Sequence, residues 1–226
     1  MAVMTQITVR GCCSMSRSPE RAIVHATISY EGPVMDPVYE RVARDLESVK
    51  ASISPIVDPD HGPVTWWSAD QLRMWSNRPR NRDGGQLPLT HHVSVGVEVE
   101  FSDFAALSAW LGSHAAATEG FRVTTVDWKL TPASRDDVLR EVRNRAVLDA
   151  VARAQQYADA LGLGAIQPVA VADAGMLPDT AGAAGAPAVG QLRRAAAFAA
   201  DGPDVELMPK DIEMSVDVDA RFVVGR

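Results

Sequence analysis

The sequence predicts an α+β fold: a mixed, largely antiparallel sheet covered by helices, with a long Ala/Gly/Pro-rich loop before the C-terminal strand. Alternation of apolar and polar residues, which is typical of half-buried strands, recurs near both ends and in the middle of the chain. Segments with helical spacing lie between these strands. The 226 residues are 46% hydrophobic and 23% charged, as in globular proteins with a core. We expect a single domain over residues 1–226.

The first quarter of the chain predicts two strands and a helix. Residues 7–11 and 21–31 are predicted strands because of their strand-like composition. We expect the two strands to pair as a hairpin. Asp36 and Pro37 predict a helix start, because aspartate can accept the free N–H groups and proline fits the first turn. The apolar residues that follow at helical spacing are Val38, Val42, Leu46, Val49 and Ile53.

The middle of the chain predicts two further strands around a second helix, preceded by an aromatic strand. Residues 64–76 are a strand candidate that carries three tryptophans. Residues 87–101 alternate so regularly that one face is expected to be buried and the other wet. Ser102 is expected to cap a helix that ends near Gly120, and residues 121–130 return as a strand. The inner stripe of this helix is predicted to be Phe104, Leu107, Leu111 and Ala115.

The last part of the chain predicts the longest helix and two strands. Ser134 and Asp137 resemble a capping box, and Gly162 is expected to stop the helix after about Leu161. Small residues recur on every fourth position of this helix, which predicts close contact with the sheet: Ala146, Ala150, Ala154 and Ala158. Residues 166–172 and 212–224 are predicted strands. Residues 174–204 between them lack a sustained period and are interpreted as a flexible loop.

The charge and cysteine content limit the kinds of partner. A formal net charge of −7 disfavours attraction of the whole surface to nucleic acid or anionic lipid, so no nucleic-acid partner is expected. Cys12 and Cys13 are adjacent, which excludes an ordinary intrachain disulfide and favours a reducing compartment. No segment approaches the roughly 18 apolar residues of a membrane span, and residues 1–15 do not resemble a secretory signal. We expect a cytoplasmic location unless the true start lies upstream.

Motifs of catalysis are not found in the sequence. There is no P-loop, no HExxH, no paired CxxC and no Gly-x-Ser-x-Gly. His91 and His92 are neighbours on a predicted strand and point to opposite faces, so they cannot chelate one metal together. Cys13 has no His or Lys close in sequence that would activate it. We therefore expect no enzyme activity, no catalytic residues, no cofactor and no metal site.

The best candidate for a binding surface is the aromatic and basic segment of residues 64–82. Trp66 and Trp67 are adjacent, so a strand sends their rings to opposite faces, and one of them needs a cover other than the core. Aromatic and arginine side chains are enriched at interfaces, which favours a homo-oligomer. A solvated hairpin tip, or a loop of the same chain over the tryptophan, are the alternatives. The candidate interface residues are Trp66, Trp67, Arg73, Trp75, Arg78, Arg80 and Arg82.

The order of motifs along almost the whole chain resembles the SIMPL domain family, a bacterial family of largely unassigned function with a eukaryotic signalling member. The likeness begins with V-R-G-C-C-S-M at residues 9–15 and P-E-R-A at residues 19–22. It continues with the strand of residues 92–101 and with Arg-Ala, Asp-Ala, Arg-Ala and Tyr-Ala pairs at residues 145–158. The chain differs by Cys13 in place of a common glycine, by Glu20 in place of aspartate, and by lacking the usual aromatic before residue 89.

The resemblance implies an α+β fold, ring-like homo-oligomers in some members, and links to stress defence or immunogenicity. It supplies no catalytic residues. Because the export signal of most bacterial members is not found here, their envelope role is not transferred directly. Our leading hypothesis is a non-enzymatic protein that acts by self-assembly or partner binding; a small-ligand-binding module is the alternative, and an unrecognised enzyme is third.

Overall fold

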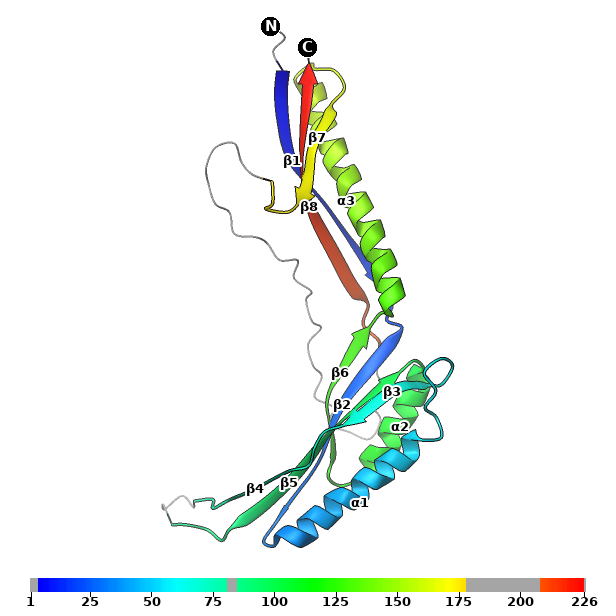
Figure 1. The fold of residues 1–226 in the computed structure, drawn as a ribbon, viewed down its shortest axis with the longest axis vertical. Helices are drawn as coiled ribbons and strands as arrows, with labels where there is room; N and C mark the ends of the chain where they lie inside the picture. Colours follow the sequence, from blue (N-terminus) through cyan, green and yellow to red (C-terminus); the bar gives the residue numbers. More distant parts are fainter. Residues whose placement is uncertain (1–3, 81–84, 178–207, 226) are drawn as a thin grey trace. The chain divides into compact units, whose positions relative to one another are not determined.

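The computed structural model describes residues 4–80, 85–177 and 208–225, which belong to two compact units (Figure 1). Within these residues, unit 1 consists of residues 4–18, 130–177 and 211–225, and unit 2 consists of residues 19–80, 85–129 and 208–210. Each unit has its own sheet, and all pairs between named strands are antiparallel. The α+β class is therefore confirmed, with two sheets where the sequence led us to expect one. That residues 1–226 form one domain stays a prediction.

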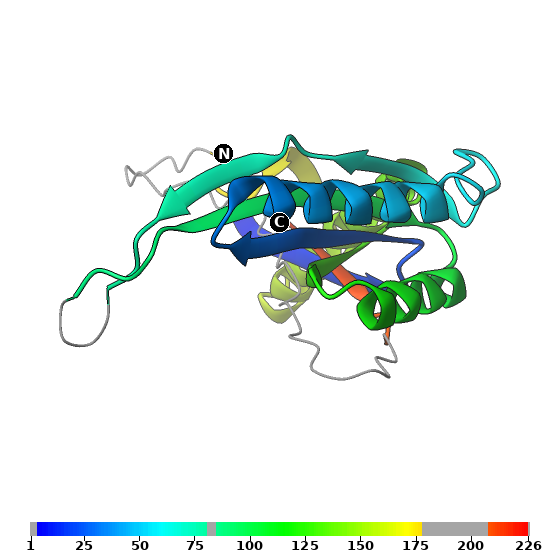
Figure 2. The ribbon, with the colours of Figure 1, turned by 90° about the horizontal axis from the view of Figure 1, so that it is seen from below.

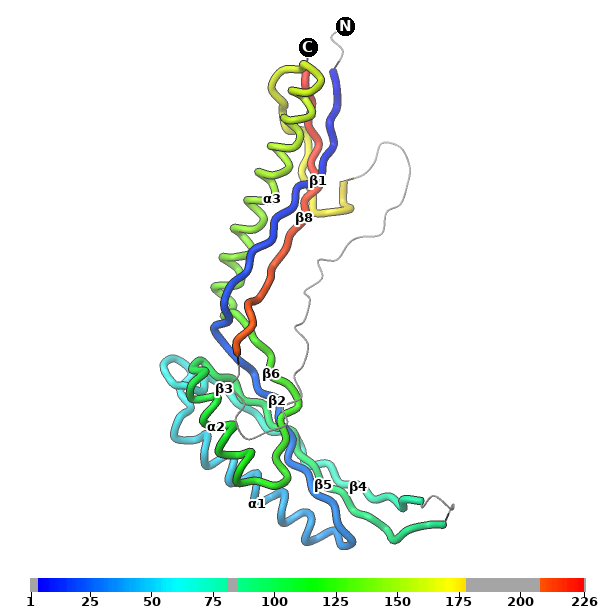
Figure 3. The backbone as a smooth tube through the Cα atoms, turned by 180° about the vertical axis from the view of Figure 1, so that it is seen from behind, coloured from blue at the N-terminus to red at the C-terminus, as the bar shows by residue number. Residues whose placement is uncertain are grey.

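Unit 1 is a three-stranded sheet with one helix on it. The strand order is β1 (Met4–Arg17), β8 (Ile212–Gly225) and β7 (Gln167–Asp173), and helix α3 (Pro132–Ala160) packs on β1 and β8. The first and last strands pair over their whole length (Figure 3). The predicted hairpin of residues 7–11 and 21–31 is wrong, because β1 pairs with β8 along its whole length, whereas residues 21–32 pair with strands of the other sheet.

The long helix lies very close to β1, as its alanine spacing predicted. Ala146, Ala150, Ala154 and Ala158 are all completely buried. Opposite them stands Gly11, where a Cβ atom would lie 2.6 Å from the Ala150 nitrogen and also against the Ala146 carbonyl oxygen. Only a glycine on the strand and small residues on the helix permit this separation.

Asp149 and Arg153 fasten the same helix to the strand. The Cys12 backbone N–H donates to Asp149 Oδ2 at 2.9 Å, and Arg153 Nε lies 2.9 Å from the same oxygen. The Cys12 hydrogen bond, with a smaller contribution from Arg153, holds the pKa of Asp149 below its usual value. The alanines of this helix thus contact the face of the sheet, and Asp149 and Arg153 contact Cys12 on its edge strand.

Unit 2 contains a broader sheet covered on one face by two helices (Figure 2). Its strand order is β3 (Val64–Ala69), β5 (Thr90–Phe101), β2 (Arg21–Gly32) and β6 (Phe121–Lys129), and β4 (Arg73–Asn77) pairs with β5 beyond the end of β3. Helix α1 (Met35–Ile53) packs on β2 and β5, and α2 (Phe104–Ala117) packs on β5 and β6. In the described parts of the chain, no helix combines the length and apolar character needed to cross a membrane.

The core of unit 2 lies between these helices and one face of the sheet. All five predicted apolar residues of α1 are buried, as is the predicted inner face of β5 from Val93 to Phe101. On α2, Trp110 and His114 are buried with Leu107 and Leu111, whereas the predicted Ala115 is exposed. The helix turns Trp110 and His114 toward the core, and this rotation turns Ala115 outward.

Several boundaries differ from the prediction by local geometry. The predicted strand of residues 64–76 is two strands, because residues 70–72 oppose only two residues of β5 between the pairs Ala69–Val97 and Arg73–Ser94. Helix α2 is capped by Asp103, while Ser102 donates its hydroxyl to the Gly62 carbonyl at 2.7 Å. Helix α3 is capped by Thr131 in place of Ser134.

The starts of helix α1 and strand β5 also differ from the prediction. Asp36 lies in the first turn of α1, and the N-cap position is Val34, with no side-chain cap. The predicted strand of residues 87–101 begins at Thr90, because Pro88 has no N–H to donate to a ladder. Most of the predicted loop of residues 174–204 lies outside the described residues.

Replacement of Gly11 by alanine tests the close contact in unit 1. The added methyl group meets backbone atoms of α3, which cannot rotate away, so we expect a loss of about 3 kcal/mol in the free energy of unfolding. For a chain of this size, that is a fall of about 6–12 °C in the unfolding midpoint. Gly225→Ala on β8, where a Cβ meets nothing within 4 Å, is the matched control. Equal midpoints for both variants would contradict the contact.

Acid should weaken unit 2 through His114. This imidazole is buried against Trp110 and Phe121, its Nε2 lies 2.8 Å from Ser52 Oγ, and burial lowers its pKa below the ordinary 6.5. Below pH 6.5, His114 is therefore protonated in the unfolded chain but stays neutral in the folded chain. The free energy of unfolding consequently falls as the pH drops toward the lowered pKa. Thermal unfolding between about pH 7 and pH 5 should show a shallower loss for His114→Phe than for the native protein. Identical slopes would exclude this role.

Candidate functional site

The face of the unit 2 sheet opposite the helices carries a row of ionisable side chains, which we call the open face. His25 on β2 lies between two carboxylates, with Nδ1 3.1 Å from Glu98 Oε1 on β5 and Nε2 3.4 Å from Asp127 Oδ2 on β6. The His25 side chain is 32% exposed and both carboxylates are 46% exposed. Because water screens groups this exposed, the triad contributes little to stability and stays accessible to a partner.

The next position along the open face centres on Glu100. Thr65 donates its hydroxyl to Glu100 Oε1 at 2.6 Å, and Arg21 Nε lies 3.9 Å from the same oxygen. Trp66 is paired with Glu100 across β3 and β5 and is 46% exposed. An exposed indole therefore stands beside an acidic and hydrogen-bonded row.

The far end of the open face is built by β4 and the start of β5. The rings of Trp75 and His92 stack with centroids 5.1 Å apart and an interplanar angle of 6°. His92 Nδ1 lies 3.2 Å from Glu31 Oε2, and its Nε2 lies 2.9 Å from Asn77 Oδ1. This stack orients Trp75, whose outer surface remains exposed.

Strand β4 and the three residues after it form an exposed segment, residues 73–80, which we call the limb. All five residues of β4 are exposed. Its two large apolar side chains point to opposite faces, where Met74 is 55% exposed and Trp75 is 47% exposed. Exposed apolar side chains on both faces of one strand make the limb a candidate contact surface.

The structure separates the residues predicted as an interface. Trp66 is on the open face, whereas Trp67 pairs with Val99 and packs against the core, so the prediction that their rings point to opposite sides is confirmed. Arg73 and Trp75 share one face of β4, and Arg78 and Arg80 follow in the limb. Arg82 lies outside the described residues. The other residues of the open face were not singled out from the sequence, although the alternation of β2 and β5 contained the signal.

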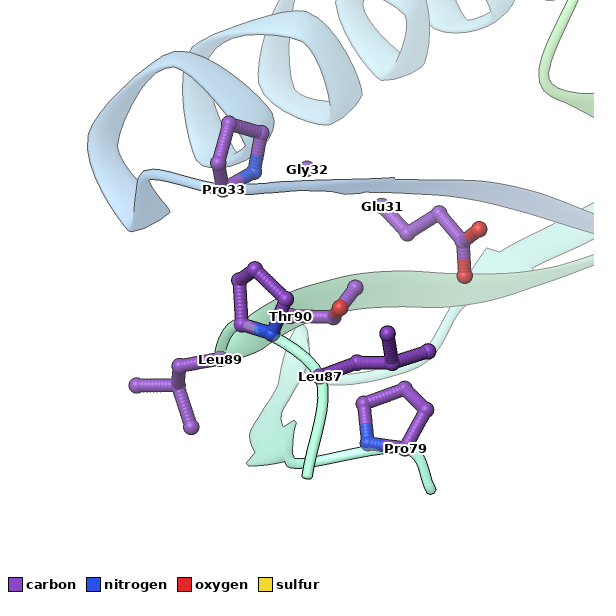
Figure 4. Close-up of a pocket in the computed structure, with 8 residues that line it drawn as sticks. Glu31, Gly32, Pro33, Pro79, Leu87, Leu89 and Thr90 are labelled. Atoms are coloured by element: carbon purple, nitrogen blue, oxygen red, sulfur yellow. The ribbon is translucent and has the colours of Figure 1, made fainter. Parts of the chain in front are cut away.

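A shallow cavity of about 340 Å³ opens beside the limb (Figure 4). Proline rings and leucine side chains supply most of its wall, and Glu31 contributes a carboxylate. Such a wall suits a small apolar group better than a polar substrate. The residues that line the cavity are Glu31, Gly32, Pro33, Pro79, Leu87, Pro88, Leu89 and Thr90.

One exposed loop brings together groups that a metal ion can use. Ligand atoms of Asp58, Asp60 and His61 lie within 4.8 Å of one another. Asp58 Oδ1 accepts the N–H groups of Asp60 and His61, so closure of the turn explains the position of that carboxylate. The sequence pattern alone did not predict this cluster.

Both cysteines are free, as predicted. Cys12 is exposed, and Arg153 Nη2 lies 3.3 Å from its sulfur. Cys13 is half-buried and packs beside the contact of α3 with the sheet. The proximity of Arg153 to Cys12 is not evident from the sequence, because 141 positions separate the two residues.

Comparison with known proteins gives one positive finding. The family model described as SIMPL, protein of unknown function (DUF541), matches residues 7–222. The match therefore includes strands and helices of both units. No curated protein matches the chain.

Proposed function

Because the chain belongs to the SIMPL family, whose function is unknown, we propose that it is a non-enzymatic protein that acts by self-association through the limb of unit 2. The observation that carries this proposal is the exposure of β4 on both faces, with Met74 on one and Trp75 on the other. Tryptophan, methionine and arginine are the residue types enriched at protein interfaces, and the limb contains all three.

The position of β4 in the sheet supports the same proposal. β4 pairs with β5 on one side only, so its other edge offers backbone N–H and C=O groups to a partner. Edge strands are commonly protected by proline, a bulge or charged side chains, and Arg73 is the one residue of β4 that belongs to these types. A partner strand or loop would satisfy the edge and cover both apolar side chains.

The resemblance to the family adds a broader context. We keep a stress- or envelope-related role as part of the proposal on that resemblance. The cytoplasmic location stays a prediction. A small-ligand-binding module is the second candidate function, and the cavity beside the limb favours it, because its apolar wall and single carboxylate could receive a small molecule.

Substitution of the three tryptophans by serine should separate association from folding. Light scattering of the native protein at micromolar concentration should give a mass well above 24.2 kDa. Trp75→Ser and Trp66→Ser should lower that mass with little change in unfolding midpoint, because both rings are about half exposed. Trp67→Ser should instead cost about 2 kcal/mol or more of stability, because its ring packs on the core.

A monomer at all accessible concentrations would remove the self-association proposal. Ligand binding would then be the leading candidate, and the cavity beside the limb would be the place to test it.

A further inference from the structure

The arginines of the limb have no partner of opposite charge within the described residues. No carboxylate of these residues lies within ion-pair distance of Arg73, Arg78 or Arg80. The sequence from residue 73 to residue 82 contains four arginines and no acidic residue, although the whole chain carries a net charge of −7. A surface that covers the limb should therefore be acidic.

The opposite end of unit 2 carries the complementary charge. The loop between α1 and β3 holds the exposed carboxylates of Asp58 and Asp60 within 4.8 Å of each other. Among the described residues, no Lys or Arg forms an ion pair with either one. His61 is the only basic group of this close cluster.

These two ends cannot meet within one copy. Figure 2 shows the limb and the loop at opposite ends of unit 2, with α1 running between them. A helix of 19 residues is about 28 Å long, which is far beyond any direct contact between side chains. The limb can therefore meet such a loop only on a second molecule, and a second copy of this chain supplies both complementary groups.

We propose that the limb of one copy docks on the Asp58–Asp60 loop of a second copy in a head-to-tail contact. This inference rests on the proposed self-association and names its two surfaces. Trp75 and Met74 supply the apolar centre of the contact, and the arginine and aspartate side chains supply a charged rim that fixes its register. A contact between two different surfaces leaves one of each free on the pair, so association continues beyond a dimer.

Charge reversal with mixing tests the contact on the full chain. Arg78→Glu and Asp60→Arg are made separately; Asp60 is chosen because Asp58 closes its own turn. Each variant alone should associate at least about tenfold more weakly than the native protein, because like charges then face each other. An equimolar mixture should regain association, since each limb then meets a loop of opposite charge. Sedimentation at several protein concentrations measures all of these states.

A control variant and three possible results test the head-to-tail contact. Arg143→Glu on α3, an exposed arginine that forms no ion pair among the described residues, makes the same charge change and should leave association unchanged. The head-to-tail contact is wrong if neither charge reversal weakens the native oligomers, or if mixing the two variants does not restore association. Either result leaves self-association itself standing. A native protein that is monomeric throughout overturns both. Thermal unfolding of each variant distinguishes loss of association from loss of folding.

Discussion

The width of a helix is the constraint on which the proposed role of unit 2 depends. An α-helix with its side chains is about 10–12 Å wide and strands are about 4.8 Å apart, so one helix covers roughly two strands. Helix α1 lies on β2 and β5, and α2 reaches from β5 to β6. Strands β3 and β4 lie beyond these main helix contacts. Val64 and Trp67 join β3 to the core, whereas all five residues of β4 are exposed. Its apolar side chains therefore remain exposed in a unit whose other strands have a packed core on one face.

The same constraint shapes unit 1 with a different result. Its sheet has three strands, and its single helix packs on two of them, β1 and β8. The contact is close because Gly11 faces the alanine stripe, and Asp149 and Arg153 secure its polar edge. β7 lies at the other side of this sheet, where Val169 and Val171 are about half exposed.

Periodicity predicted most elements because it depends on local burial alone. The stripe of α1, the inner face of β5 and the alanines of α3 each follow from one segment meeting one apolar layer. The pairing of β1 with β8 could not be predicted in this way, since it joins residues more than 190 positions apart. Helix caps were misplaced by one to three residues because Ser102, Asp103, Thr131 and Ser134 all have side chains that can cap.

The candidate site was predictable only in part, because some of it depends on pairing between segments far apart in the sequence. Composition alone pointed to the tryptophans and arginines, and adjacency alone put Trp66 and Trp67 on opposite faces. Which of the two rings is exposed depends on the register of β3 with β5, and that is not a local property. The contact of His25 with Glu98 and Asp127 also needs three strands from separate parts of the chain.

Hydrogen exchange as a function of protein concentration tests most directly whether the bare strand β4 is covered by another copy. The account predicts that backbone amides of residues 73–77 exchange more slowly as concentration rises and return to fast exchange on dilution. Amides of α3, which are bonded within the helix, serve as the internal reference and should not change. Exchange of residues 73–77 at the same rate at every concentration would contradict the account.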